Sequence, residues 1–399
     1  MHERLGVAGR VVVVALLAAL AGCAAGRPDF HGAHAPPPPV PAPAAAAARP
    51  VGATPALDLA HLSALEDILP ALAGRRVVYV GETHDRYAHH LVQLEIVKAM
   101  HAAQPRLAIG MEMFQQPFQS YLNDYIAGVL SEREMLVATE YFQRWRYDYR
   151  LYAPILRYAR EHGLPVVALN VDGDLVGKVR ALGLDGLEAA DRSRLPADID
   201  RSNAQYEARL RQIFAEHPQT TGGRGFDRFL DGQLLWDEGM AERAAQYLEE
   251  HPDHAMVVLA GSGHLAYGDG IPQRLARRVP VTSTIVLNGW EGEITPKVAD
   301  YLLMPETQTL PAPGRIGAVL VPGAKGLRVD SCAKDSACAA AGLRKGDSLL
   351  AINDVPVSDL SDVNSVMWDR KPGETVRVNV RRAGWFVRPE ERGYVIELR

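Results

Sequence analysis

The sequence predicts an α/β fold with a largely parallel sheet flanked by helices, followed by a small β-rich domain. Two observations predict the α/β part: short, continuously apolar runs rich in β-branched residues, and helical spacing of apolar residues between them. A strand that is apolar at every position is buried on both faces, as in a parallel sheet covered by helices. From Gly314 onward the pattern changes to short strands and turns, including the strictly alternating run 376–381, which predicts the second domain.

The length and charge of the chain limit what it can be. At 399 residues it is long enough for two or three domains, since one domain takes about 150 residues. Hydrophobic residues make up 47% and charged residues 23%, which is typical of globular proteins with a buried core. The net charge of −5 offers no basic surface for a phosphate backbone, so we expect no nucleic-acid partner.

Strands and helices alternate along the α/β domain. A predicted helix over residues 57–72 precedes a predicted strand at 77–80. The further predicted strands cover 107–111, 166–169, 255–260 and 281–287, and the helices between them include 87–103 and the long amphipathic 226–250. This order predicts a sheet with helices on both faces.

The first 23 residues are predicted to be a signal peptide. Arg4 and Arg10 precede an apolar run over 11–20, which is shorter than the roughly 20 apolar residues that span a bilayer. The run leads into the sequence LAGC, which resembles the lipobox of bacterial lipoproteins, and this resemblance implies that Cys23 becomes the lipidated N-terminus. An ordinary signal peptide with an incidental cysteine is the alternative.

Residues 24–50 are rich in proline and alanine, which predicts an extended tether without a core of its own. A lipidated Cys23 implies a bacterial membrane lipoprotein that faces the periplasm. Ala24 stands where lipoproteins kept at the inner membrane often carry an aspartate, so the resemblance favours the outer membrane.

The two remaining cysteines are Cys332 and Cys338. In an oxidising compartment they form an even pair, close enough in sequence to close a small loop, which predicts a disulfide. Two buried thiols that act as small hydrophobic side chains are the alternative.

Polar residues follow four of the predicted strands: His84, Glu112, Asn170 and His264. Glycine shortly before each histidine allows the backbone to turn sharply there. In open α/β sheets ligands bind in the crevice outside the carboxyl ends of the strands. We therefore expect these four side chains to be neighbours.

Imidazole and carboxylate groups are ligands for zinc, iron and manganese, and they are also general acids and bases. The four residues therefore predict a cofactor, metal or catalytic site at this edge of the sheet. Each histidine taken alone could instead be a hydrogen-bonded residue at a strand end. Glu82 is open to a second interpretation too, because an acidic residue at the start of a helix interacts favourably with the helix dipole.

Three further groups bear on this site. Of His89 and His90 in the following helix, we expect one to face the crevice and the other to lie on a solvated helix face. Asp237 lies in mid-helix beside an apolar stripe, so it either pairs with a buried base such as an arginine, which we favour, or reaches the site. The segment 141–152 is dense in aromatic residues, which suit either a porphyrin wall or core packing.

Five stretches spread over the first domain, residues 51–310: VVYVGETHDRYAHHLVQ, IGMEMFQ, VVALN, QLLWDEGMAE and VVLAGSGHLAYG, in that order. Together they resemble the ChaN family of haem-binding lipoproteins, members of the Tiki superfamily. The resemblance implies a periplasm-facing lipoprotein that binds haem at a homodimer interface, with a tyrosine on the iron. Tyr149 and Tyr152 are our candidates for that tyrosine.

The wider Tiki superfamily implies a different function. It contains metal-dependent peptidases and esterases whose site is formed by two GxxH sequences and a strand-end glutamate, corresponding here to His84, His264 and Glu112. Haem binding, with His84, His264 and Asn170 beside the cofactor, and hydrolysis with zinc or manganese therefore stand as alternatives.

The C-terminal stretch AGLRKGDSLLAIND resembles a bacterial PDZ domain, which extends over residues 314–399. The resemblance implies a groove for a peptide C-terminus, with Arg315, Ile316, Gly317 and Ala318 in place of the carboxylate-binding loop. These residues match the family loop only loosely, so a PDZ domain used for packing alone is the alternative.

The sequence thus predicts a lipid-anchored protein that binds haem or iron and takes part in their uptake, with a PDZ domain for a partner or peptide. A metal-dependent hydrolase is the first alternative. A PDZ scaffold with an inert first domain is the second.

Overall fold

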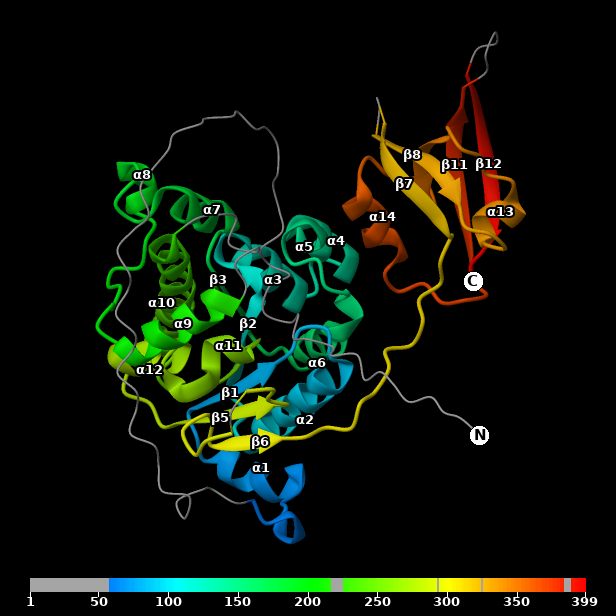
Figure 1. Ribbon diagram of the computed structural model, residues 1–399. Helices are drawn as coiled ribbons and strands as arrows, with labels where there is room; N and C mark the ends of the chain where they lie inside the picture. The colour runs from blue at the N-terminus through cyan, green and yellow to red at the C-terminus, as the bar shows by residue number, and fades with distance from the viewer. Residues whose placement is uncertain (1–56, 217–224, 293, 324–325, 384–388) are drawn as a thin grey trace, which may run out of the picture.

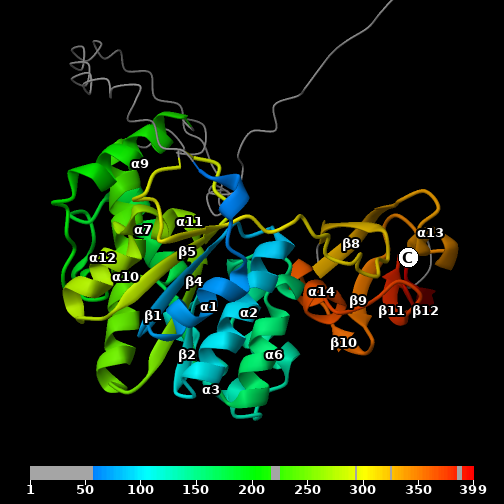
Figure 2. The ribbon, with the colours of Figure 1, turned by 90° about the horizontal axis from the view of Figure 1, so that it is seen from below.

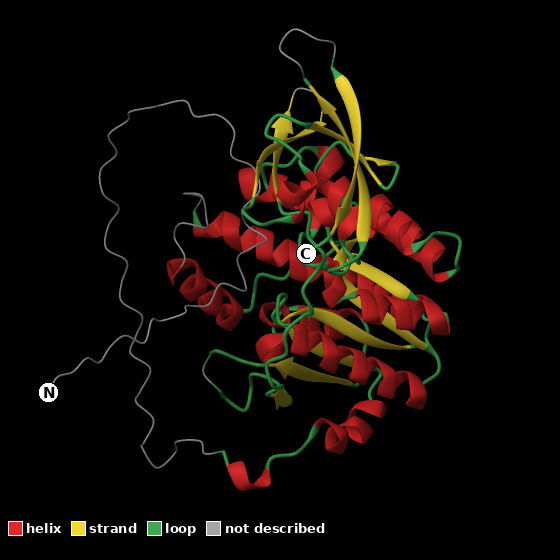
Figure 3. Ribbon diagram, turned by 90° about the vertical axis from the view of Figure 1, so that its right-hand side faces the viewer, coloured by secondary structure: helices red, strands yellow, loops and turns green. Residues whose placement is uncertain are grey.

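The computed structural model describes residues 57–216, 225–292, 294–323, 326–383 and 389–399. The predicted signal peptide, Cys23 and the tether lie outside the described residues. Within these ranges, none of the helices combines the length and the apolar character needed to cross a membrane. The chain forms the two predicted domains, one of layered helices and strands and one composed mainly of strands (Figures 1 and 3).

The first domain contains a parallel sheet, as predicted. Its strands are β1 (Val77–Glu82), β2 (Leu107–Gln115), β3 (Val166–Asn170), β4 (Ala255–Gly261), β5 (Ser283–Asn288) and β6 (Tyr301–Leu303), in the spatial order β3-β2-β4-β1-β5-β6. Every neighbouring pair is parallel. The carboxyl ends of β1 to β4 therefore meet at one edge of the sheet.

Helices cover both faces of this sheet (Figure 1). One face packs against α1 (Leu65–Ala73), α2 (Tyr87–Ala103), α3 (Gln119–Ile126) and α6 (Ala153–His162), and the other against α10 (Phe226–Glu250) and α12 (Ile271–Arg278). Val78 and Val80 of β1 belong to the core on the first face. Val77 and Tyr79 belong to the core on the other face, which explains why β1 is apolar at successive positions.

The described part of the first domain contains six further α-helices. They are α4 (Glu132–Ala138), α5 (Tyr141–Arg144), α7 (Gly173–Leu182), α8 (Ala189–Arg192), α9 (Ala204–Glu216) and α11 (Ser262–Leu265).

The first helix is shorter than the sequence predicts, because it begins at Leu65 and not at residue 57. Leu57, Leu59 and Leu62 are each more than half exposed. Apolar spacing stabilises a helix only where that face covers a core, and these leucines cover none in the described structure. The Asp67 carboxylate instead accepts a hydrogen bond from the Ala64 N–H and marks the start of α1.

The second domain is an antiparallel sheet, as predicted. Its strands are β7 (Ala318–Gly323), β8 (Gly326–Cys332), β9 (Ser348–Ile352), β10 (Val355–Pro356), β11 (Thr375–Arg382) and β12 (Glu390–Glu397), in the order β12-β11-β9-β8-β7, with β10 paired to β9. Two helices complete it, α13 (Ala337–Ala341) and α14 (Leu360–Met367). The alternation in β11 has the expected cause, because Val376, Val378 and Val380 all point into the core.

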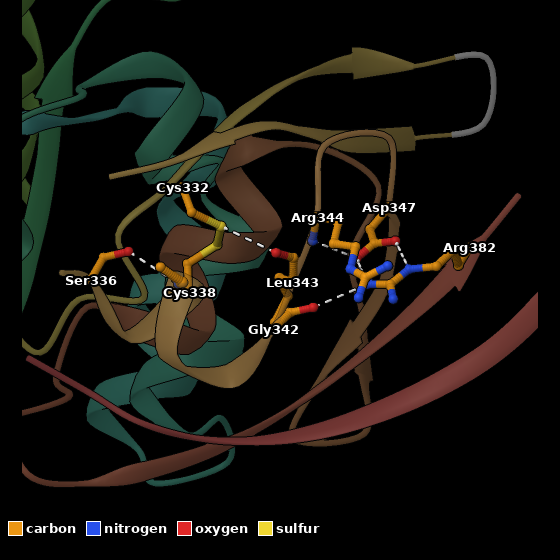
Figure 4. The surroundings of a disulfide bond; sticks show 9 residues. Cys332, Ser336, Cys338, Gly342, Leu343, Arg344, Asp347 and Arg382 are labelled. Carbon is orange, nitrogen blue, oxygen red and sulfur yellow. Dashed lines mark hydrogen bonds and ion pairs between the residues drawn. A yellow bond between two sulfur atoms is a disulfide. The ribbon is translucent and has the colours of Figure 1, made fainter. Parts of the chain in front are cut away.

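Cys332 at the end of β8 and Cys338 in α13 form a disulfide, with their Cα atoms 5.5 Å apart (Figure 4). This confirms the predicted pairing and excludes the alternative of two buried thiols. An ion pair lies close to the disulfide: the buried Asp347 carboxylate accepts two hydrogen bonds from the Arg382 guanidinium (Figure 4).

Candidate functional site

The carboxyl edge of the parallel sheet borders a cavity of about 1590 Å³. His84, Glu112, Asn170 and His264 all line it, so the structure brings together the four residues that the sequence places at strand ends. Ordinary small-molecule pockets have volumes of about 300–1,000 Å³. The volume of this cavity is larger, which leaves room for a large planar ligand.

Glycine permits the close approach of the strand ends. A Cβ atom at Gly261 would lie 3.0 Å from His84 Cε1 and 3.2 Å from His84 Nε2. A Cβ atom at Gly81 would lie 2.5 Å from a Leu287 methyl carbon. Both distances are shorter than ordinary Cβ contacts, so a larger residue at either position would displace the Leu287 or His84 side chain.

A buried carboxylate holds His84 in place. His84 Nδ1 lies 2.8 Å from Glu82 Oε1, and the same carboxylate accepts hydrogen bonds from Gln93 Nε2 and from the Tyr152 hydroxyl. Burial opposes ionisation of Glu82, but the charge of His90 and the hydrogen bond of His84 outweigh it and lower the pKa of Glu82. With Nδ1–H directed at Glu82, His84 Nε2 is the nitrogen that lies beside Gly261.

His264 lies between two carboxylates. Its Nδ1 is 2.5 Å from Asp237 Oδ1, and its Nε2 is 3.5 Å from Glu112 Oε1. Burial lowers the pKa of His264, but the charges of Glu112 and Asp237 more than offset this and raise the pKa to about 10. His264 is therefore an imidazolium ion at neutral pH.

This contact decides between the two interpretations of Asp237. The carboxylate pairs with a buried base, as favoured, but the base is His264 and not an arginine, and through it Asp237 reaches the site. Tyr206 donates a second hydrogen bond to Asp237, at 2.6 Å. The pairing joins a helix and a strand end that are distant in sequence, so helix periodicity alone could not reveal it.

Glu112 lies between the two histidines. Its Oε2 accepts a hydrogen bond of 2.7 Å from the Gly261 N–H. Burial raises the pKa of Glu112, but the charge of His264 outweighs it, so the pKa is lowered. The Asn170 side-chain amide donates to the Glu112 backbone carbonyl and so connects the ends of β2 and β3.

The two histidines of α2 behave differently from the prediction in one respect. His89 lines the cavity, as expected for one of the pair, and burial lowers its pKa to about 4. The prediction of a solvated helix face for His90 is wrong, because its side chain is buried. His90 hydrogen-bonds Gln93 and the His84 backbone carbonyl, and it lies 3.3 Å from Glu82.

Neither predicted iron ligand reaches the cavity. Tyr149 is fully buried, and its hydroxyl donates to Glu132 Oε1 at 3.0 Å. Tyr152 is also fully buried, and its hydroxyl donates to Glu82 Oε1 at 2.9 Å behind His84. Tyr147 in the same aromatic segment does line the cavity, with its ring 5.0 Å from that of His84. The segment turns irregularly between α5 and α6, so the spacing of the three tyrosines in the sequence does not show which of them faces the cavity.

Aromatic rings and unpaired polar atoms also line the cavity, together with charged side chains such as Arg144 and Arg209. Trp145, Trp236 and Trp290 line it together with Tyr147. Asn170 Oδ1 and Ser262 Oγ are buried and have no hydrogen-bond partner within the described structure. Such atoms are normally satisfied by a ligand or by water, so the wall suits a ligand that is mainly aromatic and carries some polar groups.

The same residues form no ready metal site. In the part of the chain that the structure describes, no three or more His, Cys, Asp or Glu side chains are grouped so that they could hold a metal ion. His84 and His264 each direct Nδ1 at a carboxylate, and His264 Nε2 faces Glu112. The described residues thus show no preformed zinc or manganese site at His84, Glu112 and His264.

The loop predicted to bind a peptide carboxylate leads into β7. Gly317 has φ +73°, and a Cβ atom there would lie 2.5 Å from Ser336 Cβ, so this position requires glycine. The Ile316 carbonyl accepts from the Cys338 N–H, and Arg315 exchanges two backbone hydrogen bonds with Arg399. The N–H groups of Ile316 and Gly317 donate no hydrogen bond among the described residues, so they can receive a carboxylate.

A family model described as "Haem-binding uptake, Tiki superfamily, ChaN" matches residues 68–275, more than half of the chain. The protein therefore belongs to this family of the Tiki superfamily. A PDZ domain model matches residues 314–386, as the antiparallel sheet of the second domain suggests.

Individual relatives are distant. Protein RETICULATA-RELATED 5, chloroplastic, of Arabidopsis thaliana is 25% identical in an alignment of 240 residues, and the match covers 54% of this chain and 31% of the relative. The chain thus spans about a third of the length of that curated relative.

Solved structures show likeness at low identity. ChaN of Campylobacter jejuni with cofacially bound haem is 19% identical and matches 60% of this chain and 91% of its own, with a TM-score of 0.49. An EreC erythromycin esterase mutant is 17% identical over 56% of this chain and 72% of its own, with a TM-score of 0.35. The HtrA-type protease AlgW, in complex with a decapeptide, is 20% identical over 22% of this chain and 29% of its own, with a TM-score of 0.20.

Proposed function

We propose that the first domain binds haem in the cavity at the carboxyl edge of its sheet, and that the protein serves haem or iron uptake. The observation that carries this proposal is the cavity of about 1590 Å³ whose wall includes Tyr147 and three tryptophans. Membership of the haem-binding ChaN family supports it. Bound haem would supply a ferric iron that accepts a phenolate ligand.

Tyr147 is the residue that we assign to the iron, in place of Tyr149 and Tyr152. Both of those hydroxyls are buried and donate to carboxylates, whereas the Tyr147 ring forms part of the cavity wall. Burial, and then the charge of Asp85, raises the pKa of Tyr147 to about 12. Ligation therefore requires that Tyr147 release its proton, so haemin affinity rises with pH, by up to about tenfold per pH unit.

The test is a haemin titration of the chain from residue 51 onward, followed by its Soret and charge-transfer bands. We expect saturation at one or two haems per chain and a phenolate-type spectrum. Tyr147→Phe removes that spectrum, whereas the matched variant Tyr149→Phe retains it. Absence of a saturable spectrum in the unaltered chain would refute haem binding, and retention of the spectrum in Tyr147→Phe would refute the ligand assignment.

Membrane anchoring through Cys23 and a homodimer with haem at its interface complete the proposal. Cys23→Ser is expected to remove incorporated fatty acid and to release the protein from the outer-membrane fraction. Addition of haemin is expected to double the molecular mass that light scattering measures, from one chain to two. A lipid-free protein in unaltered cells would contradict the anchor, and an unchanged mass would contradict the dimer.

A metal-dependent hydrolase is the second candidate function. The observation that favours it is the pair of carboxylate-held histidines on either side of Glu112. His84, Glu112 and His264 would hold a zinc or manganese ion, which would supply an activated water for hydrolysis, or His84 Nε2 would act as the base. Ester hydrolysis that needs zinc or manganese and is lost in Glu112→Gln, without a haemin spectrum, would favour this candidate over haem binding.

We also propose that the PDZ domain binds the C-terminus of a partner at residues 315–318. The free N–H groups of Ile316 and Gly317 support this assignment. A wild-type phenotype in a His84→Ala, His264→Ala double variant would instead favour a scaffold with an inert first domain.

A further inference from the structure

The second domain has an unpaired strand edge beside a helix. β7 is the last strand of its sheet and pairs only with β8, so within the described structure its other edge is open. α14 lies beside it (Figure 1). Side chains near β7 and side chains of α14 pack on the same core. They are Ile316, Ala318 and Leu320 on the strand side and Val363 and Met367 on the helix side. We call the open edge of β7, together with α14, the peptide groove, since an added strand here would find apolar contacts for its side chains.

α14 also packs on the first domain, against α4 and α5 (Figure 1), and Figure 2 shows it at the boundary between the two domains. The ring of Trp368, the residue that ends α14, meets the ring of Tyr149 edge-on at 4.9 Å. The Arg157 guanidinium lies 5.2 Å from the centre of the Trp368 ring. Glu132 joins these partners, because it accepts hydrogen bonds from both Tyr149 and Arg157. We call this contact the Trp368 seam.

The seam and the cavity share one short segment of chain. Tyr149 is two residues from Tyr147 in the cavity wall and three from Tyr152, which hydrogen-bonds Glu82. Trp145, four residues before Tyr149, meets the His84 ring edge-on at 4.9 Å. A shift of Tyr149 would therefore move side chains that contact His84.

The linker between the domains makes a second connection. Residues 307–310 line the cavity, and the Pro311 carbonyl accepts a hydrogen bond of 2.6 Å from Arg150. The carboxylate-binding loop begins at Arg315, only five residues after Leu310. The peptide groove is thus joined to the cavity wall by this linker as well as by α14.

We propose that the peptide groove and the haem cavity are energetically coupled, so that a C-terminal peptide in the groove strengthens ligand binding in the cavity. This inference rests on the proposed function of both sites. A bound peptide holds α14 from the groove side while Trp368 holds it against the first domain. The two contacts together keep segment 141–152 and the linker in the arrangement that forms the cavity wall, and coupling of this kind acts equally in both directions.

The experiment uses the chain from residue 51 onward, which contains all the described residues, and fluorescein-labelled decapeptides that end in Val, Leu, Phe or Ala. Haemin is titrated with and without a saturating amount of the tightest peptide, and that peptide is titrated with and without haemin. We expect each ligand to lower the Kd of the other by the same factor, about fivefold or more. Trp368→Ala should bind both ligands independently, whereas Trp368→Phe and the exposed control Val395→Ala should remain coupled.

Equal haemin affinity with and without bound peptide in the unaltered chain would overturn the proposal, as would failure of all four peptides to bind. Failure of haemin alone refutes the proposed haem site, and the coupling is then decided by hydrogen–deuterium exchange. Peptide should slow exchange in 141–152 and 305–313 as well as in β7 and α14. Protection confined to residues 316–367 of the unaltered chain would overturn the coupling. Peptide binding by Trp368→Ala shows that the variant domain is folded.

Discussion

His84 and His264 follow matching glycine turns at the ends of β1 and β4, yet the two are held differently. His84 is oriented by Glu82, two residues before it in the same turn, and α2 supplies Gln93 to the same carboxylate. His264 is oriented by Asp237 from α10 and approached by Glu112 from β2. One histidine thus has a mostly local partner, and the other depends on elements brought together by the fold.

This difference shows that similar sequence motifs do not produce the same charge pairing, although nearby carboxylates raise the pKa of both histidines. Glu82 is shared among several donors, whereas His264 receives two carboxylates for one imidazole. The pKa of His264 is consequently raised to about 10, and its proton is held between Asp237 and Glu112.

The largest effect is expected on the His84 side. Glu82→Ala leaves the donors of Gln93, Tyr152 and His84 without their buried acceptor, so the free energy of unfolding should fall by about 3–5 kcal/mol. Urea unfolding followed by circular dichroism measures it. Glu82→Gln should lose less, since its amide oxygen still accepts. A loss below about 1 kcal/mol in Glu82→Ala would show that these donors find other partners.

A smaller effect is expected on the His264 side. Asp237→Asn should lower the free energy of unfolding by about 1–3 kcal/mol, because His264 retains Glu112 when the charge of Asp237 is lost. Asp227→Asn, at an exposed position at the start of the same helix, should change it by less than about 0.5 kcal/mol. Equal losses in the two variants would contradict the role of Asp237 as the partner of His264.

The pH dependence of stability should distinguish His264 from its surroundings. The folded pKa of about 10 lies above the ordinary value of 6.5, so the contribution of His264 is complete below about pH 6.5 and is lost as the pH rises toward 10. The advantage of the unaltered chain over His264→Gln should therefore shrink over this range, by on the order of 1 kcal/mol per pH unit. A difference that stays constant from pH 6 to pH 10 would contradict the doubly paired imidazolium.

The smallest effect is expected at Ser262, which belongs to the turn before His264 and lies against Gly81. Its hydroxyl is buried without a partner in the described structure, so Ser262→Ala should change the free energy of unfolding by less than about 0.5 kcal/mol. If the hydroxyl contacts the cavity ligand, haemin affinity should fall while stability stays the same. A large loss of stability would show that the hydroxyl is hydrogen-bonded in the apoprotein.

Much of the fold could be predicted because its signals are local. Continuous apolar runs marked the strands of the parallel sheet, and the polar residue after each strand marked the edge where the cavity lies. The disulfide followed from two cysteines six residues apart. Each of these features depends on residues that are close in sequence, so a local sequence pattern is enough to predict it.

The failures have one physical cause. The sequence predicted a solvated helix face for His90, but the side chain is buried because it packs beside Gln93 and the buried Glu82 carboxylate. The aromatic segment was identified, but which tyrosine faces the cavity depends on the irregular turns between α5 and α6. The periodic spacing of apolar residues shows neither which donors a buried carboxylate requires nor how an irregular turn directs its side chains.

Sequence patterns were enough to predict the two domains and the edge of the sheet at which the site lies. They also predicted His84, Glu112, Asn170 and His264 as residues of that site. The tertiary structure alone decided that Asp237 pairs with His264, that Tyr147 and not Tyr149 or Tyr152 lines the cavity, and that Trp368 joins the two domains. Burial and charge pairing between distant segments act only once the chain has folded, so these contacts leave no periodic pattern in the sequence.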